Sequence, residues 1–153
     1  MAMAKEGAVR PEVIIVGAGP SGLAVSACLS LRGVPSLIPE RDDCVGSTWR
    51  KRTYDRLILR FTKRATALPH APHPAAAPTY LPRDGFADYL DGYAARFGDG
   101  GELIGDDGLL KQCNPKAENG LYYAGLSGTG IYGSSMDAEF IAADISKQLQ
   151  PEH

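Results

Sequence analysis

The pattern of apolar residues near the start of the chain predicts a strand, a helix and a second strand in that order. A continuous apolar run, mostly β-branched, predicts a buried parallel strand over residues 12–16. Small and apolar residues then recur at three- and four-residue steps over residues 21–31, which indicates a helix with one packed face. Gly33 is expected to end this helix in a left-handed conformation, and residues 34–38 predict the second strand. The order is that of a βαβ unit with a right-handed crossover.

The middle of the chain predicts a long loop followed by a helix. No element is assigned to the basic residues 51–64. The five prolines of residues 68–82 favour an extended loop, because proline disrupts helices and central strands. Residues 86–97 regain a helical period, and Asp84 is the expected N-cap of that helix.

The C-terminal part of the chain predicts a strand and a last helix. Residues 121–126 are mostly apolar and are expected to form a short strand. Ser134 or Ser135 is the expected cap of the helix that follows. The apolar stripe of that helix is expected to consist of Met136, Phe140, Ile141, Ile145 and Leu149. The predicted fold class is α/β.

Length and composition fit one globular domain. The 153 residues, 44% of them hydrophobic and 22% charged, are too few for two complete nucleotide-binding domains. Five glycines among acidic residues mark a boundary over residues 98–108. We therefore divide the chain into a flexible N-terminus (1–10), a first part of the domain (11–97), a junction rich in Gly and Asp (98–117) and a second part of the domain (118–150).

Charge and cysteine content argue against several classes of protein. A net charge of −2 gives no global reason to expect nucleic acid or an anionic membrane surface as a partner. The three cysteines have no CxxC spacing, which fits a reduced intracellular setting. The first apolar run is too short for a signal peptide or a membrane span. These features predict a cytoplasmic protein.

The strongest chemical signal is a GxGxxG motif between the first predicted strand and the first predicted helix. It consists of Gly17, Ala18, Gly19, Pro20, Ser21 and Gly22. In such a motif the first glycine permits a tight turn, the second lets the backbone approach a pyrophosphate, and the third lets helix and strand pack closely. The N–H groups at the helix start would face the phosphate.

An acidic residue stands where the motif requires one. Glu40 ends the second predicted strand, 23 positions after Gly17. A carboxylate there would accept hydrogen bonds from the adenosine ribose, and it favours FAD or NAD over NADP because it would repel a 2′-phosphate. The alternative is a glycine-rich turn beside an ordinary surface glutamate.

Several blocks of sequence resemble the FAD domain of the YUCCA-type flavin-containing monooxygenases of plants. The first blocks are VIIVGAGPSGLAVSACLSLRGVPSLIPER at residues 13–41, GSTW at 46–49 and KRTYDRLIL at 51–59, and the resemblance continues to Phe97. ENGLYYAGL at residues 118–126, followed by GIYG and MDA, resembles the family's C-terminal segment, which returns to the FAD domain.

The resemblance implies a Rossmann-like FAD-binding domain and an oxidoreductase that uses two cofactors. In this family NADPH reduces FAD, and the reduced flavin activates oxygen to oxygenate a small-molecule substrate. The YUCCA branch converts indole-3-pyruvate to the auxin indole-3-acetate. By position, the resemblance assigns cofactor contacts to Gly17, Ala18, Gly19, Pro20, Ser21, Gly22, Glu40, Arg41, Gly46, Ser47, Trp49, Gly125 and Tyr132. It assigns no catalytic side chain and no metal.

The chain departs from the family pattern in its middle. The family's second glycine-rich motif, for NADPH, and its fingerprint between the two dinucleotide motifs are missing, so the junction at residues 98–117 stands where the NADPH domain would be. Pro39, directly before Glu40, removes a backbone donor at the strand end and can shift the carboxylate. The alternative to an active monooxygenase is therefore a catalytically inactive FAD-binding remnant or a truncated gene product.

Other candidate features favour no further chemistry. The basic stretch 50–64 holds only two aromatic residues, so a solvated or cofactor-facing surface is expected rather than a nucleic-acid site. His70 and His73 have no cysteine or carboxylate cluster near them in the sequence, so no metal site is expected. Cys28 is expected to pack within the first helix's small-residue face.

Overall fold

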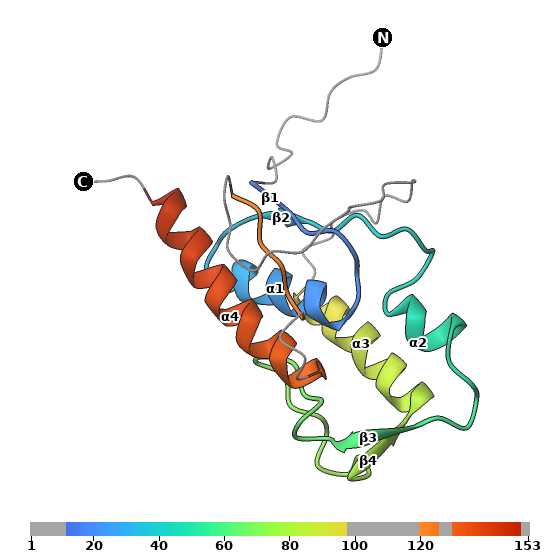
Figure 1. Ribbon diagram of the computed structural model, residues 1–153. Helices are drawn as coiled ribbons and strands as arrows, with labels where there is room; N and C mark the ends of the chain where they lie inside the picture. The colour runs from blue at the N-terminus through green and yellow to red at the C-terminus, as the bar shows by residue number, and fades with distance from the viewer. Residues whose placement is uncertain (1–11, 98–119, 126–129, 151–153) are drawn as a thin grey trace.

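The computed structural model describes residues 12–97, 120–125 and 130–150, and its N-terminal part is a βαβ unit. Strand β1 (Val13–Ile14), helix α1 (Pro20–Ser30) and strand β2 (Ser36–Leu37) follow one another, and β1 pairs with β2 in parallel (Figure 1). Gly33 has a φ of 71°, which confirms its left-handed conformation after α1. The predicted order of strand, helix and strand is confirmed.

The two strands are shorter and less buried than the sequence pattern predicts. Backbone hydrogen bonds continue past β1, from Ile15 N to the Leu37 carbonyl (2.8 Å) and from Gly17 N to the Pro39 carbonyl (2.8 Å). Ile14 and Val16 are 66% and 60% exposed. The expectation of a fully buried strand was wrong, because the described residues cover only one face of this two-stranded sheet.

A short helix and a hairpin-like pair of strands occupy the middle of the chain. Helix α2 (Ser47–Lys51) is followed by strands β3 (Ile58–Thr62) and β4 (Tyr80–Pro82), which pair antiparallel. The proline-rich segment between them forms irregular turns, as predicted, apart from β4 at its end. Strand β3 was not predicted, because the charged residues of this stretch obscure its alternation and Leu59 is its only buried residue.

Helix α3 (Arg83–Phe97) contains the predicted helix but begins earlier. Asp84 lies inside its first turn, so its assignment as the N-cap was wrong. Strand β4 runs directly into α3, and the Asp84 carboxylate pairs with Arg83 at 2.8 Å instead of capping the helix. The buried face of α3 consists of Phe86, Ala87, Leu90 and Tyr93.

Helix α4 (Gly130–Leu149) also begins before its predicted cap. Ser134 and Ser135 lie within the helix, so neither caps it. Their hydroxyl groups bond elsewhere, Ser134 to the Ser21 hydroxyl at 2.7 Å and Ser135 to the Ala67 carbonyl at 3.2 Å. These bonds hold the first turns of α4 against α1 and against the loop after β3.

The described residues 120–125 form no strand, so the predicted C-terminal strand was wrong for that segment. Side chains of α4 bind it in place of a neighbouring strand. The Asp137 carboxylate accepts a hydrogen bond from Gly125 N at 2.8 Å, and the Asp144 carboxylate accepts one from the Tyr122 hydroxyl at 2.5 Å. Among the described C-terminal residues, the helix is therefore the one regular element that returns to the N-terminal unit.

The face of α4 that packs on α1 differs from the predicted stripe. Ile141 and Ile145 are buried as expected, but Met136 and Phe140 are 62% and 69% exposed. Leu149 is exposed too. Small residues take the vacant positions on the buried face, namely Gly133, Ser134, Ala138 and Ala142. Small residues let the two helix backbones approach closely, which the spacing of large apolar residues alone could not reveal.

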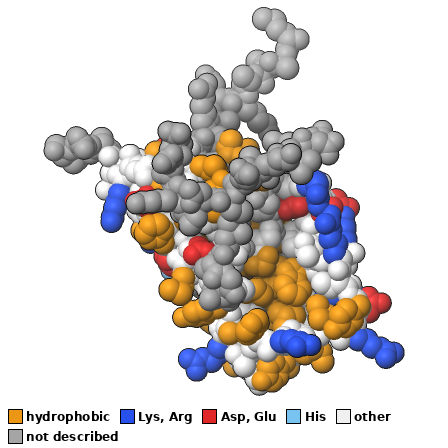
Figure 2. Space-filling view, viewed as in Figure 1, with side chains coloured by type: hydrophobic (Ala, Val, Ile, Leu, Met, Phe, Trp, Pro, Cys, Tyr) orange, Lys and Arg blue, Asp and Glu red, His pale blue; other side chains and the backbone are white. Residues whose placement is uncertain are grey.

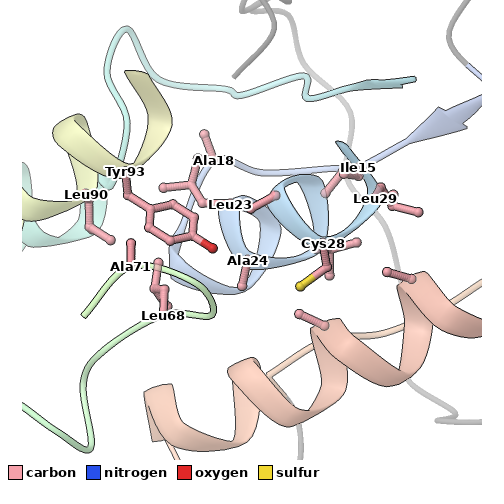
Figure 3. Close-up of a cluster of buried hydrophobic side chains, with 14 of the residues drawn as sticks. Ile15, Ala18, Leu23, Ala24, Cys28, Leu29, Leu68, Ala71, Leu90 and Tyr93 are labelled. Atoms are coloured by element: carbon pink, nitrogen blue, oxygen red, sulfur yellow. The ribbon is translucent and has the colours of Figure 1, made fainter. Parts of the chain in front are cut away.

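The core surrounds α1. Both α3 and α4 pack against this helix, and Figure 3 shows side chains of α1 meeting Leu90 and Tyr93 of α3 and the loop residues Leu68 and Ala71. Figure 2 shows apolar side chains gathered on the surface beside α4 and over β3 and β4. The exposed large apolar residues of β3, β4 and α4 include Ile58, Phe61, Tyr80, Met136 and Phe140. Within the described ranges, no helix combines the length and apolar character needed to cross a membrane.

Candidate functional site

A pocket of about 250 Å³ opens where β1, β2 and α2 meet. It lies beside the turn between β1 and α1, the end of β2 and the loop that leads into α2. Its lining residues are Val16, Gly17, Gly19, Pro20, Pro39, Glu40, Arg41, Asp42, Gly46, Ser47, Thr48 and Trp49. The structure therefore brings together the glycine motif, the acidic residue after β2 and the block at residues 46–49.

The three glycines of the motif occupy three different environments. Gly17 has a φ of 98°, a conformation that favours glycine. A Cβ atom on Gly22 would lie 2.0 Å from the Gly17 carbonyl oxygen, so only glycine allows the helix to start this close to the turn. A Cβ atom on Gly19 would meet nothing within 4 Å, so the backbone there faces open space.

The first turn of α1 has no side-chain cap. Gly19 is the N-cap residue, and Pro20 follows at the start of the helix. Proline is suited to this position because its missing N–H would have no helical partner. The remaining N–H groups of the first turn carry partial positive charge and can bind an anion.

The Glu40 carboxylate ties the end of β2 to the glycine turn. It is buried, and it accepts hydrogen bonds from Ala18 N at 2.5 Å and from Asp42 N at 3.0 Å. Each carboxylate oxygen retains a second lone pair, so further hydrogen bonds remain possible. Pro39 does not turn the carboxylate away from the motif, since its own carbonyl accepts the bond from Gly17 N.

The loop before α2 is fixed against the same turn. Gly46 N donates to the Ala18 carbonyl at 2.9 Å, and Gly46 has a left-handed backbone with a φ of 60°. A Cβ atom there would lie 2.7 Å from the Leu90 side chain. The Trp49 ring packs edge-on against Phe86, with ring centroids 4.9 Å apart. The pocket wall is therefore anchored on α3.

Five residues that the resemblance assigned to the cofactor are not among the lining residues of the pocket, namely Ala18, Ser21, Gly22, Gly125 and Tyr132. Gly125 contacts the first turn of α1 instead, since a Cβ atom on it would lie 2.3 Å from the Ser21 hydroxyl oxygen and 3.2 Å from that of Ser134. Tyr132 lies on α4 with 57% of its surface exposed. The Ser21 hydroxyl is hydrogen-bonded to the Ser134 hydroxyl. The group that Ser21 can offer to a ligand at the start of α1 is therefore its backbone N–H.

The pocket also contains residues that the sequence analysis did not assign to the cofactor. Val16, Pro39, Asp42 and Thr48 line it, and each is adjacent in sequence to a residue that was named. A hydrogen bond from Ser47 lowers the pKa of Asp42, and the nearby Lys51 ammonium lowers it further. Among the described residues that line the pocket, none is a His, Cys, Lys or Tyr that could act as a general base near neutral pH.

Comparison with known proteins identifies the relatives of this chain. A family described as an NAD(P)-binding Rossmann-like domain matches residues 15–80. The chain is 59% identical over 87 residues to the probable indole-3-pyruvate monooxygenase YUCCA4 of Arabidopsis thaliana. The aligned region covers 57% of the chain and 21% of that protein. The resemblance to the YUCCA monooxygenases is confirmed. The rice (Oryza sativa subsp. japonica) indole-3-pyruvate monooxygenase YUCCA1 is 53% identical over 88 residues, covering 58% of the chain and 22% of that protein.

Solved structures support the same fold. A flavin-containing monooxygenase from Stenotrophomonas maltophilia is 26% identical, with a TM-score of 0.51 over 56% of this chain and 26% of that one. The S-allyl-L-cysteine S-oxygenase of Allium sativum, 20% identical with a TM-score of 0.52 over 60% of this chain and 27% of that one, is similar in fold. The Rossmann-like α/β class is thereby confirmed. The chain spans about a fifth of the length of the curated YUCCA relatives that it matches.

Proposed function

We propose that this chain binds FAD and forms the flavin-binding part of an NADPH-using monooxygenase of the YUCCA type, acting on indole-3-pyruvate or a related small molecule to give indole-3-acetate. The observation that carries the proposal is the shape of the glycine turn. Gly22 is packed against the turn, Gly19 faces open space, and the buried Glu40 carboxylate accepts a hydrogen bond from Ala18 N within the same turn. The similarity to YUCCA monooxygenases adds the reaction class.

The pocket fits one end of FAD. The diphosphate would lie over Gly19, with its charge facing the first turn of α1, and the adenosine ribose would lie against Glu40. A 2′-phosphate would be repelled there by Glu40 and Asp42, which argues against NADP at this position. The pocket volume of about 250 Å³ lies below the range of about 300–1,000 Å³ that encloses whole drug-sized ligands. The flavin ring would therefore extend beyond the described pocket.

Bound FAD would supply the redox chemistry, and the chain's own residues would hold and orient it. Backbone N–H groups at the start of α1 would bind the diphosphate, and Glu40 would fix the ribose. The wall formed by Gly46 and Trp49 would exclude water on one side of the cofactor. No side chain is assigned a proton-transfer role.

A change at Gly19 tests the flavin site. Gly19 has an extended backbone, φ −80° and ψ 177°, which valine adopts readily, and a side chain there meets no protein atom within 4 Å. Gly19→Val should therefore fold normally but lose FAD, as measured by the visible spectrum of the purified protein and by flavin titration. Gly92→Val is the matched control, because that glycine on α3 also faces open space and lies away from the pocket lining. Full retention of FAD by Gly19→Val would contradict the proposal.

A second measurement tests whether FAD stabilises the fold. FAD binds only the folded state, so the midpoint of thermal unfolding should rise with FAD concentration. The rise should persist in the control Gly92→Val and be absent in Gly19→Val. An unchanged midpoint at saturating FAD would count against flavin binding.

A specific observation favours a second candidate function, an FAD-binding protein that does not accept hydride from NADPH. The sequence contains one GxGxxG motif, and the chain matches about a fifth of its relatives' length. Anaerobic addition of NADPH to the FAD-loaded protein separates the two candidates. Bleaching of the flavin absorbance supports the monooxygenase, and persistent oxidised flavin supports the binding protein.

A further inference from the structure

Three side chains that are far apart in the sequence meet beneath α4. They are Cys28 on α1, His70 in the loop between β3 and β4, and Glu139 on α4. His70 Nε2 lies 2.7 Å from Glu139 Oε1, and Cys28 Sγ lies 3.9 Å from His70 Nε2. All three potential ligand atoms lie within 4.8 Å of one another. The expectation that His70 has no cysteine or carboxylate nearby holds along the sequence but not in space.

The spacing suits a tetrahedral metal ion. Zinc binds sulfur at about 2.3 Å, imidazole nitrogen at about 2.0 Å and carboxylate oxygen at about 2.1 Å, so its ligand atoms lie on the order of 3.5 Å apart. The observed separations lie on both sides of that value, and small side-chain rotations would equalise them. A thiolate, an imidazole and a carboxylate together favour zinc or cobalt over calcium or magnesium.

The backbone holds His70 in an uncommon conformation that directs it to this cluster. Within the described ranges, His70 is the only residue other than glycine with a positive φ, at 64°. Such a conformation is unfavourable for histidine and persists only where the surrounding structure enforces it. Tyr89 and Tyr93 of α3 enforce it here, since their hydroxyl groups donate to the carbonyls of Ala71 at 2.7 Å and Pro69 at 2.9 Å.

Arg32 orients the carboxylate from behind. Its guanidinium donates to Glu139 Oε2 at 3.1 Å and to the Cys28 carbonyl at 3.0 Å, which leaves Glu139 Oε1 directed at His70. Outer partners of this kind fix the orientation of metal ligands. The arginine charge partly offsets the carboxylate, so binding depends on the thiolate as the second anionic ligand.

The cluster is open to solvent on one side and closed on the other. The side chains of His70 and Glu139 are each 41% exposed, whereas Cys28 is fully buried. Figure 3 shows the Cys28 sulfur pointing from α1 toward α4. An ion can therefore enter between His70 and Glu139, reach the sulfur and retain a water molecule as its fourth ligand.

We propose that Cys28, His70 and Glu139 bind one zinc-type divalent cation, which links α4 to the N-terminal βαβ unit. Coordination forms a metal–sulfur bond and releases the thiol proton to solvent, with no change of oxidation state. Because this site shares no lining residue with the pocket at Gly19, its occupancy is independent of the flavin proposal.

Cobalt titration of the metal-free, full-length chain tests the site. Cobalt bound to a thiolate gives a near-ultraviolet charge-transfer band, which should saturate at one ion per chain and disappear when zinc is added. Cys28→Ser should abolish the band. Cys44→Ser and Cys113→Ser are the matched controls and should keep it. Absence of the band from the unmodified chain, or its persistence in Cys28→Ser, overturns the proposal.

Two exposed substitutions test the other ligands without disturbing the core. His70→Asn keeps a residue that tolerates a positive φ, and Glu139→Gln keeps an acceptor for Arg32. Each should weaken cobalt binding at least about tenfold, the lower limit for losing even an outer partner of a metal site. Zinc binding should raise the thermal midpoint of the unmodified chain, and each substitution should reduce that rise. Unchanged affinity in both variants overturns the assignment of His70 and Glu139 as ligands.

Discussion

The two ends of α1 differ in what surrounds them. At the N-terminal end, Gly19 and Pro20 face a pocket and no side chain caps the helix. Toward the C-terminal end, Ala27 and Cys28 are fully buried among α4 and its neighbours. The first end presents backbone groups to the pocket, whereas the second is packed by side chains and contributes Cys28 to the proposed metal site. The start of the helix therefore faces open space, and the rest of it packs against α3 and α4.

The largest expected effect on stability comes from adding a side chain at the N-terminal end of α1. A Cβ atom on Gly22 would lie 2.0 Å from the Gly17 carbonyl, and neither backbone can move without separating α1 from β1. Gly22→Ala should lower the free energy of unfolding by about 3 kcal/mol. Gly19→Ala, whose Cβ meets nothing within 4 Å, is the control and should change it little. Urea denaturation measures both free energies of unfolding. Equal losses for the two variants would contradict the prediction that only Gly22 is tightly packed.

The next substitutions test whether residues 120–125 contact the N-terminal end of α1. Gly125 and Gly120 both have a positive φ, at 84° and 77°, but only Gly125 lies against Ser21. Gly120→Ala should lower the free energy of unfolding by about 1 kcal/mol through backbone strain alone. Gly125→Ala should lower it by about 2 kcal/mol more, because its Cβ would overlap the Ser21 hydroxyl. Ser21→Ala should restore part of that difference, and an absent rescue would place the strain elsewhere.

A smaller effect is expected at the carboxylate beside the motif. Glu40→Gln leaves one oxygen to serve the two N–H groups of Ala18 and Asp42, so one buried donor loses its acceptor. The free energy of unfolding should fall by about 1.5 kcal/mol. FAD affinity should fall as well, as measured by flavin titration. Glu12→Gln, at an exposed position, is the control for charge alone. A Glu40→Gln protein as stable as this control would show that the carboxylate does not hold the turn.

The smallest expected effect is the pH dependence of stability that arises from protonation of the buried His73. The His73 ring packs at a tilt against the Tyr89 ring, with centroids 3.8 Å apart, and hydrogen-bonds to the Thr66 hydroxyl; burial lowers the pKa of His73 below its ordinary value. The unfolded chain then binds the proton more readily than the folded one. This contribution to stability is complete above about pH 6.5 and is lost as the pH falls below it. Unfolding measured from pH 7 to pH 5 should show a steeper decline for the unmodified chain than for His73→Gln. Parallel curves would mean that His73 does not resist protonation.

The same contrast explains which features the sequence could predict. The βαβ unit and the glycine turn depend on residues 13–40, which are close together in the chain, and the sequence places them correctly. The caps at Asp84 and Ser134 were wrong because β4 continues directly into α3 and α4 starts at Gly130, which only the whole fold decides. Met136 and Phe140 were placed in the core because helical spacing cannot distinguish a face that packs from one that does not.

The candidate sites show the same difference between features set by neighbouring residues and features set by the whole fold. The glycine motif and Glu40 were assigned from a short local pattern and the block at 46–49 from the family resemblance, and the structure brings most of these residues to one pocket. Gly125 and Tyr132 were assigned by position in a family pattern, and neither lines the pocket. The meeting of Cys28, His70 and Glu139 was missed because it requires three distant segments to be folded together.

The packing of α4 on α1 also sets the order in which the chain can fold during synthesis. The apolar surface of α1 leaves the ribosome well before Ala138, Ile141 and Ile145, which cover it and come much later in the sequence. An emerging chain therefore carries an uncovered helix until α4 has been made. Exposed apolar surface of this kind is prone to aggregation until α4 docks.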